Sequence, residues 1–174
     1  MLPNIMVLSM WRNDSERNIE HRMRHLLRLQ ITTKLAQLRW VWVVGDSADA
    51  TEQILRQQAL TASTSGLDVE VVLHNTGIVG EAYGPHPDPH SRMLRSSQTV
   101  SAGLDCVRDA DTYVLYCESD LRLASGLVDR FVESGKCPVA GWVILKVENP
   151  PIFYDTWAYR GLDGVHFTNH PPYH

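Results

Sequence analysis

The sequence lacks long apolar runs: none approaches the ~20 consecutive apolar residues that a membrane-spanning helix needs. Residues 1–10 carry no basic leader and are too few for a signal segment. Cysteine is scarce, and its three residues lack metal-ligand spacing, which argues against a disulfide framework or a zinc site. Repeats, low-complexity segments and linkers are also missing. We therefore expect a single domain over residues 1–174 that works in the cytoplasm, with reduced cysteines and no membrane span.

What the chain does contain is an alternation of strand and helix patterns. Apolar runs predict strands over residues 5–10, 40–45, 69–73, 113–117, 138–145 and 151–159. Three- and four-residue apolar spacing predicts helices over residues 15–38, 52–60, 91–107 and 124–134. Parallel strands need such crossover helices, so we predict an α/β fold with a central, mostly parallel sheet flanked by helices. The Gly- and Pro-rich segment 74–90 is too long for a plain connection, which is typical of functional loops.

The formal net charge of −4 argues against a surface that binds nucleic acid throughout, yet it leaves room for a local basic face. Such a face is predicted on the helix over 15–38, where it is formed by Arg17, His21, Arg24, His25 and Arg28. It has two interpretations. It is either an ordinary solvated helix face or a surface that meets a polyanionic acceptor.

The most informative stretch is the run 113–117, which ends in two carboxylates, Glu118 and Asp120. Its unbroken apolar character predicts a strand buried on both faces. Open α/β sheets bind ligands at the carboxyl ends of their strands, and residues two apart on a strand point to the same side. Two such oxygen donors can hold one hard divalent cation. The alternative is that residues 118–120 only cap the following helix.

The order of several short motifs resembles the nucleotide-sugar glycosyltransferases of the A-type (GT-A) fold, similar to family 2. The motifs are 12–14, 43–47, 91–95 and the acidic triplet 118–120. Residues 153–160 are similar to a motif of capsule-associated mannosyltransferases, and related segments are expected in virus-encoded sugar transferases that modify DNA bases. In the GT-A family the triplet binds the metal and the diphosphate. Here it reads Glu-Ser-Asp instead of the commoner Asp-X-Asp. The resemblance implies a single Rossmann-like domain, in the host cytoplasm if the protein is virus-encoded.

The resemblance also implies a set of residues that bind the nucleotide sugar. Trp11, Arg12 and Asp46 would line the base and ribose pocket, with Ser9 at the end of the first strand. Arg92 or Arg95 would neutralise the diphosphate, for which a guanidinium is well suited, and Ser119 belongs to the same set. Each has a plainer alternative: Trp11 as packing, Arg12 as a surface charge, and Asp46 as a turn or capping residue.

The metal and catalytic residues follow from the same resemblance. Glu118 and Asp120 would hold Mn²⁺ or Mg²⁺, and a histidine of the C-terminal tail, His170 or a neighbour, would complete the shell. Asp155 would act as the general base on the acceptor hydroxyl. Its apolar surroundings in the sequence make an unpaired carboxylate costly, which favours a role, although it could instead anchor Arg160 or a turn.

We therefore predict a metal-dependent hexosyltransferase that moves a sugar from a nucleoside-diphosphate sugar to an acceptor hydroxyl. Two alternatives remain: a metal-dependent nucleotidyltransferase, which would use the same carboxylates, and a catalytically inactive nucleotide-sugar-binding module. A cytosolic enzyme could act on a lipid headgroup, a small metabolite, an envelope precursor or a nucleic acid. The basic helix face favours an anionic acceptor, and hydroxymethylated DNA fits this requirement.

Overall fold

The computed structural model describes residues 2–13, 16–78, 89–119, 121, 123–136, 144–146 and 152–153. The chain divides into two compact units, Met1–Gly135 and Lys136–His174. In the second unit, β5 (Ile144–Lys146) and β6 (Ile152–Phe153) form an antiparallel pair that overlaps the two predicted C-terminal strands. The expectation of one domain over the whole chain stays a prediction.

The first unit is built on a four-stranded parallel sheet. Its strands are β1 (Asn4–Trp11), β2 (Gln37–Gly45), β3 (Val69–His74) and β4 (Tyr113–Tyr116), in the order β3-β2-β1-β4. Every neighbouring pair is parallel. The predicted α/β class with a central parallel sheet flanked by helices is therefore confirmed.

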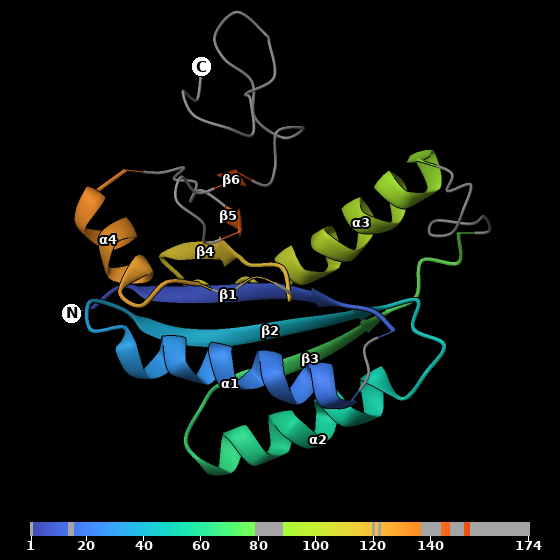
Figure 1. Cartoon of the computed structure of the whole chain (residues 1–174), viewed down its shortest axis with the longest axis horizontal. Coiled ribbons are helices and arrows are strands. Elements are labelled where there is room, and N and C mark those ends of the chain that lie inside the picture. The colour runs from blue at the N-terminus through green and yellow to red at the C-terminus, as the bar shows by residue number, and fades with distance from the viewer. Residues whose placement is uncertain are drawn as a thin grey trace, which may run out of the picture. The chain divides into compact units, whose positions relative to one another are not determined.

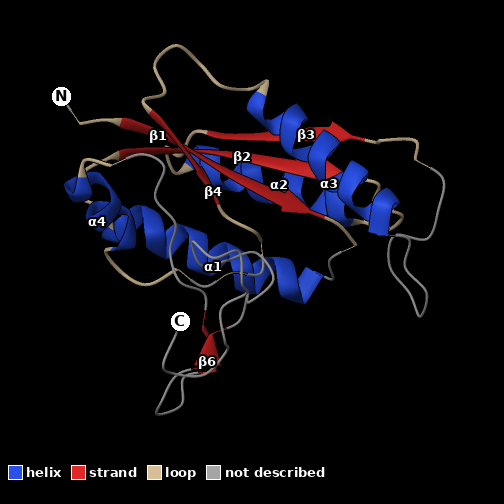
Figure 2. Ribbon diagram, turned by 90° about the horizontal axis from the view of Figure 1, so that it is seen from above, coloured by secondary structure: helices blue, strands red, loops and turns tan. Residues whose placement is uncertain are grey.

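Helices cover both faces of this sheet. The helices are α1 (Glu16–Thr32), α2 (Thr51–Thr64), α3 (Pro89–Leu104) and α4 (Leu127–Ser134). Figure 1 shows α1 and α2 on one side of the sheet and α3 on the other, and Figure 2 shows α3 lying across the strands. No helix in the described part of the chain is long and apolar enough to cross a membrane.

The strand order places a topological switch between β1 and β4. The chain adds β2 and then β3 on one side of β1, and α3 then carries it back to add β4 on the other side. The helix that leaves β1 (α1) and the helix that leads into β4 (α3) therefore lie on opposite faces of the sheet. In open α/β sheets, ligands bind at such a point, at the carboxyl ends of the strands.

Two apolar clusters hold the helices on the sheet. The larger lies on the α1 and α2 face, where Trp11, Trp40 and Trp42 are at most 2% exposed. The smaller lies under α3 and contains the fully buried Met6, Leu8, Val41 and Val43. Side chains alternate between the two clusters with the strand period of two, which explains why β1 and β2 carry apolar residues on both faces.

Helix α3 packs close to the sheet because glycine stands at the contact. A Cβ placed on Gly103 would lie 2.3 Å from Leu8 Cδ1, and one on Gly45 would lie 2.9 Å from Thr99 Oγ1. Real Cβ atoms do not approach other atoms so closely. The missing side chains therefore set the distance between α3 and strands β1 and β2.

The structure corrects the prediction that the strand before the acidic triplet is buried on both faces. Strand β4 lies at an edge of the sheet, and Tyr113, Val114 and Tyr116 are 40%, 40% and 42% exposed. Only Leu115 is half-buried within the strand, and Cys117 after it is 1% exposed. An unbroken apolar run does not distinguish an edge strand from a central one.

The first helix is also shorter than predicted, because it ends at Thr32 instead of residue 38. Leu38 keeps the helical spacing but belongs to β2. The carboxylate of Asp129 on α4 accepts hydrogen bonds from the backbone N–H groups of Lys34 and Leu35, both at 2.9 Å. These groups are thereby satisfied outside a helix, so the chain can turn into β2.

Candidate functional site

The candidate site lies at the carboxyl edge of the sheet, defined here as the edge where strands β1–β4 end. The loops after β1, β2 and β3 and the segment after β4 all leave from this edge, because the strands are parallel. Most residues that the sequence singles out for nucleotide-sugar binding follow these strands or lie on α3.

Two residues of this edge adopt a left-handed backbone conformation. Asn13 has φ of 46° and Asp46 has φ of 47°, and both follow closely on a strand. Asparagine and aspartate tolerate this region better than other side chains with a Cβ. The Asn13 side-chain oxygen accepts a 2.9 Å hydrogen bond from the Ala48 N–H, and the Asn13 N–H donates to Ser47 Oγ at 3.2 Å. The loops after β1 and β2 are thus joined.

Asp46 joins the loop after β2 to the loop after β3. Its carboxylate accepts hydrogen bonds from the Thr76 N–H at 2.9 Å and the Thr76 hydroxyl at 2.7 Å. Arg95 of α3 donates to the same carboxylate at 3.3 Å and also to the Ile78 carbonyl. Sequence reasoning chose Asp46 and Arg95 for separate roles, in the ribose pocket and at the diphosphate. The structure brings them into contact.

The pKa of Asp46 is lowered from its ordinary value. Burial raises it, but the hydrogen bonds from Thr76 and the charges of Arg95 and Arg12 outweigh that effect. Asp46 is therefore ionised at neutral pH. Its negative charge holds α3 and the third loop at the carboxyl edge.

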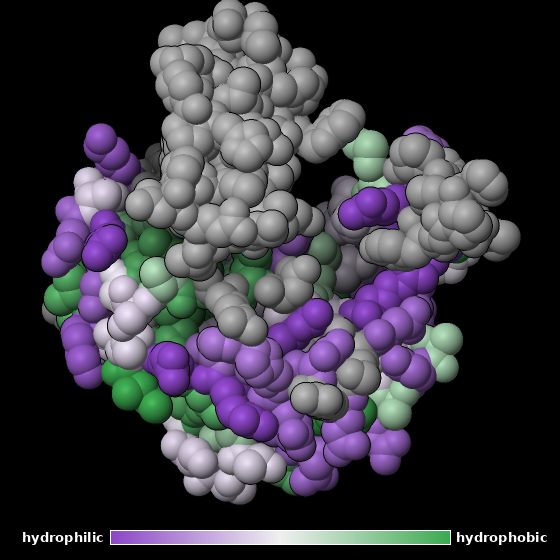
Figure 3. Space-filling model, in the orientation of Figure 1, coloured by the Kyte–Doolittle hydropathy of each residue, from purple (hydrophilic) through white to green (hydrophobic). Residues whose placement is uncertain are grey.

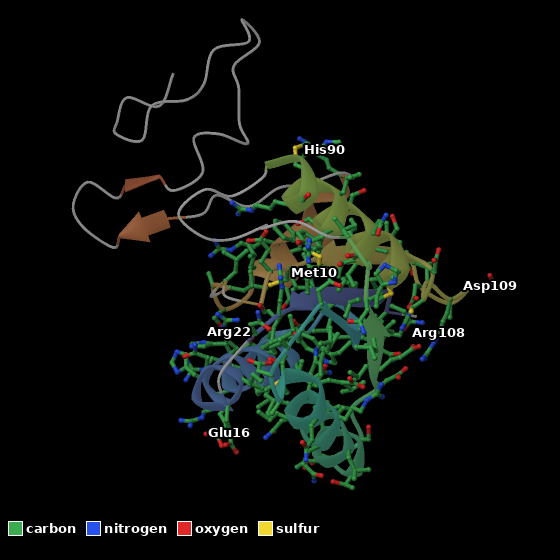
Figure 4. All side chains as sticks on the ribbon, turned by 90° about the vertical axis from the view of Figure 1, so that its right-hand side faces the viewer. Met10, Glu16, Arg22, His90, Arg108 and Asp109 are labelled. Carbon is green, nitrogen blue, oxygen red and sulfur yellow. The ribbon has the colours of Figure 1, made fainter. Side chains whose placement is uncertain are left out.

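The segment after β4 is held by a residue that sequence reasoning missed. Arg22 of α1 donates from Nη1 to Ser119 Oγ at 3.0 Å, and its Cζ lies 5.9 Å from the centre of the Trp11 ring. In Figure 4, Arg22 lies on the sheet side of α1, whereas Glu16 points away from the sheet. The only signal in the sequence is the position of Arg22 three residues after the buried Ile19, at the border of the apolar helix face.

Glu118 and Ser119 follow Cys117, the first residue after β4. The Cys117 N–H donates to the Leu8 carbonyl at 2.9 Å, which continues the pairing with β1, and Glu118 next to it is exposed. The Leu121 N–H then bonds to the Glu118 carbonyl at 3.1 Å. The chain therefore turns away from the strand direction at Glu118, at the carboxyl edge beside β1 and at the topological switch.

Ser9 and Trp11 are buried near the carboxyl end of β1. Ser9 is 0% exposed, and Trp11 is 1% exposed with its ring edge against Trp42, the centroids 6.2 Å apart. Ser9 Oγ and Trp11 Nε1 make no hydrogen bond within the part of the chain that the structure describes. The packing interpretation of Trp11 accounts for its burial, and its predicted contact with a nucleotide base stays a prediction.

The other predicted site residues are only partly described. Arg92 is exposed on α3, one turn before Arg95, and Arg12 is half-buried directly after β1. Asp120, Asp155 and His170 lie outside the described residues.

Of the three predicted metal ligands, the structure therefore describes Glu118 alone. Within the described ranges, no group of three or more His, Cys, Asp or Glu side chains could hold a metal ion. The exposed Glu118 carboxylate has the oxygen chemistry that Mg²⁺ and Mn²⁺ favour. The donor type thus fits the predicted cation.

Comparisons of the sequence with protein-family models and with curated proteins find no match. The function is therefore argued from the carboxyl edge itself.

Proposed function

We propose that this protein is a metal-dependent glycosyltransferase that uses a nucleoside-diphosphate sugar. The observation that carries the proposal is the position of Glu118 and Ser119 at the carboxyl end of β4, beside β1 at the topological switch. A carboxylate there lies where open α/β sheets bind nucleotides. Capping alone does not explain the segment, because α4 begins only at Leu127 and its N-cap residue is Gly126, not a residue of the acidic triplet.

The nucleotide-sugar site is proposed to extend along the carboxyl edge. Arg12 and Arg92 supply positive charge for the diphosphate, as guanidinium groups bind phosphate oxygens well. We assign Asp46 and Arg95 to shaping this site, because they bond to each other and to the loop after β3. Ser9 and Trp11 support it from the core below.

The chemistry requires the acidic segment and a base. Glu118, with Asp120 and His170, would hold Mn²⁺ or Mg²⁺. When bound, such a cation offsets the charge that develops on the leaving nucleoside diphosphate. Asp155 is proposed to take the proton from the acceptor hydroxyl, which makes that oxygen nucleophilic.

The proposal predicts that binding of a nucleoside diphosphate depends on the metal. UDP, GDP, CDP or ADP should raise the melting temperature in Mn²⁺ but not in chelator, because the carboxylates alone repel the diphosphate. At 100 times the Kd, the gain in folding free energy should be about 2.7 kcal/mol. Glu118→Gln or Asp120→Asn should abolish this gain.

The matched control is Glu133→Gln, which removes an exposed carboxylate from α4. It should keep the metal-dependent rise in melting temperature. Equal stabilisation in chelator and in Mn²⁺ would contradict the proposal. Release of pyrophosphate from a nucleoside triphosphate would support the nucleotidyltransferase instead.

For the acceptor we propose hydroxymethylated DNA, which the polar face of α1 would contact. In Figure 3 the surface over α1 is largely hydrophilic. This face carries charges of both signs, because Arg24 pairs with Glu20 at 3.8 Å. The side chain of Arg24 is nevertheless 76% exposed. Exposed arginines of this kind can neutralise phosphates and release their counterions.

The acceptor proposal predicts that DNA binding weakens steeply as salt rises. Arg17→Glu with Arg24→Glu should reduce sugar transfer to hydroxymethylated DNA by about tenfold or more at low salt, without changing the affinity for the nucleotide sugar. The control pair Arg56→Glu and Arg130→Glu makes the same charge change on the exposed faces of α2 and α4. If both pairs transferred sugar equally well, we would favour a small acceptor.

A further inference from the structure

We propose that Arg22 is a positioning residue that holds the segment after β4 so that the Glu118 carboxylate is presented at the topological switch. The ligand of this carboxylate, a divalent cation, rests on the proposed function. The holding role of Arg22 is independent of that function, and the two parts are tested separately below.

The first observation is the contact itself. Ser119 lies directly after Glu118 in the acidic triplet, and its hydroxyl accepts the 3.0 Å hydrogen bond from Arg22. The two residues are 97 positions apart in the chain, so the bond ties α1 to the segment that leaves β4. Cys117 is already fixed by its 2.9 Å backbone bond to Leu8. Glu118 therefore lies between two anchored residues, one in the β-ladder and one bound by Arg22.

The second observation is that Arg22 is itself oriented. Its guanidinium lies over the face of Trp11, with Cζ 5.9 Å from the ring centroid, and a cation over an indole face is attracted by the ring quadrupole. Trp11 is in turn fixed by the core and by Trp42. A rigid platform at the end of β1 therefore aims Arg22 at Ser119. This arrangement also gives Trp11 a role in the site that does not require contact with a nucleotide.

The chemistry of a metal ligand makes such support consequential. Groups that orient a metal ligand commonly alter metal affinity by 10–100-fold when they are removed, because the ligand must then be ordered on binding. Loss of Arg22 should thus weaken cation binding even though Arg22 is not a ligand. A lysine can donate the same single bond to Ser119 but lacks the planar group that lies over Trp11.

Amide hydrogen exchange tests the holding role without any ligand. In Arg22→Ala and in Ser119→Ala, the peptide that carries Cys117, Glu118 and Ser119 should exchange faster, while the β2 peptide should not. Arg56→Ala is the matched control, since Arg56 on α2 also makes one helix-surface hydrogen bond, to Glu52 at 2.8 Å. Unchanged exchange of the 117–119 peptide in Arg22→Ala would overturn the inference.

Titration with Mn²⁺ and UDP, and with Mn²⁺ and GDP, tests the consequence for binding. Arg22→Ala should weaken Mn²⁺-dependent nucleotide affinity by about tenfold or more relative to Arg56→Ala, and Arg22→Lys should recover part of the loss. Combining Arg22→Ala with Ser119→Ala should add little to either single change, because both remove the same bond. If the wild-type protein binds the nucleotide and Arg22→Ala exchanges faster over residues 117–119 but keeps its nucleotide affinity, the positioning role would be overturned. If the wild-type protein binds neither nucleotide, the proposed function fails, and exchange alone decides whether Arg22 holds the segment.

Discussion

Two aspartates lie at opposite ends of the strands of the same sheet, and each pairs with an arginine. Asp46 meets Arg95 at the carboxyl edge. Asp111, just before β4, meets Arg39 of β2 near the amino ends of the strands, where its side chain is 2% exposed. The first pair shapes the loops of the candidate site, whereas the second ties the start of β4 to β2, which is not its neighbour in the sheet.

The Arg39–Asp111 pair is a source of pH-dependent stability. The Nε group of Arg39 donates to Asp111 at 2.9 Å, and the Arg108 N–H donates at 2.8 Å. The hydrogen bonds from Arg39 lower the pKa of Asp111 more than burial raises it. Because the folded pKa lies below the unfolded one, the stabilisation is fully present above the unfolded value of about 4 and is lost as the pH falls through the lowered pKa.

Asp111→Asn should therefore destabilise the protein by about 3–5 kcal/mol at pH 7, since it removes the buried anion from Arg39 and leaves it the more exposed Glu70 at 3.8 Å. Urea unfolding should show this difference between wild type and variant shrinking below about pH 4. The control is Asp68→Asn, which breaks the exposed 2.6 Å pair with Arg108 and should cost less than about 1 kcal/mol. A loss of equal size in the two variants would contradict the assignment.

At the scale of elements, the contact between α3 and the sheet depends on a missing side chain. Gly103→Ala should destabilise the protein by about 1–3 kcal/mol, because its Cβ overlaps Leu8 and α3 must move outward. Chemical denaturation of the double variant Leu8→Ala with Gly103→Ala tests this explanation. In the Leu8→Ala background, Gly103→Ala should destabilise the protein less, because the alanine at position 8 leaves room for the new Cβ. Stabilisation by Gly103→Ala alone would show that helix propensity outweighs the clash.

The sequence predicted most helices and strands of the first unit, but not where α1 ends or which strand lies at an edge of the sheet. The apolar runs predicted β1, β2 and β3 within a few residues of the observed strands, and β1 and β2 carry apolar side chains on both faces because they are the central strands of the parallel sheet. The end of α1 was wrong, since the Asp129 carboxylate that satisfies Lys34 and Leu35 comes from a helix about 95 residues away. The exposure of β4 was missed because it depends on strand order.

In the candidate site, too, the residue types could be predicted from the local sequence, whereas contacts between residues far apart in the chain could not. Glu118, Asp46 and Arg95 could be chosen from their residue types after strands or on a helix. That Asp46 contacts Arg95, and that Arg22 contacts Ser119, depends on tertiary structure. Arg22 could not be distinguished from the other arginines of α1, because spacing along a helix does not reveal which end of which strand it faces.

At the scale of the whole molecule, the order β3-β2-β1-β4 determines which loops become neighbours. Alternation of strands and helices is compatible with several strand orders, so the switch between β1 and β4 could not be predicted. Once β4 pairs with β1, the segment after β4 lies against α1 and β1, and Arg22 can bridge them. The proposed site is thus a consequence of topology more than of any single motif.

The bonds between successive loops also decide where the chain can be altered. The Asn13–Ala48 bond joins the loop after β1 to the loop after β2, and the Asp46–Thr76 bond joins the loop after β2 to the loop after β3. A peptide inserted in any of these three loops would separate the partners. The turn between α2 and β3 is different. Gly66 has φ of 81°, it is exposed, and nothing lies within 4 Å of where its Cβ would be. A reporter peptide should therefore be inserted at this turn, where it leaves the bonds between the loops of the site intact.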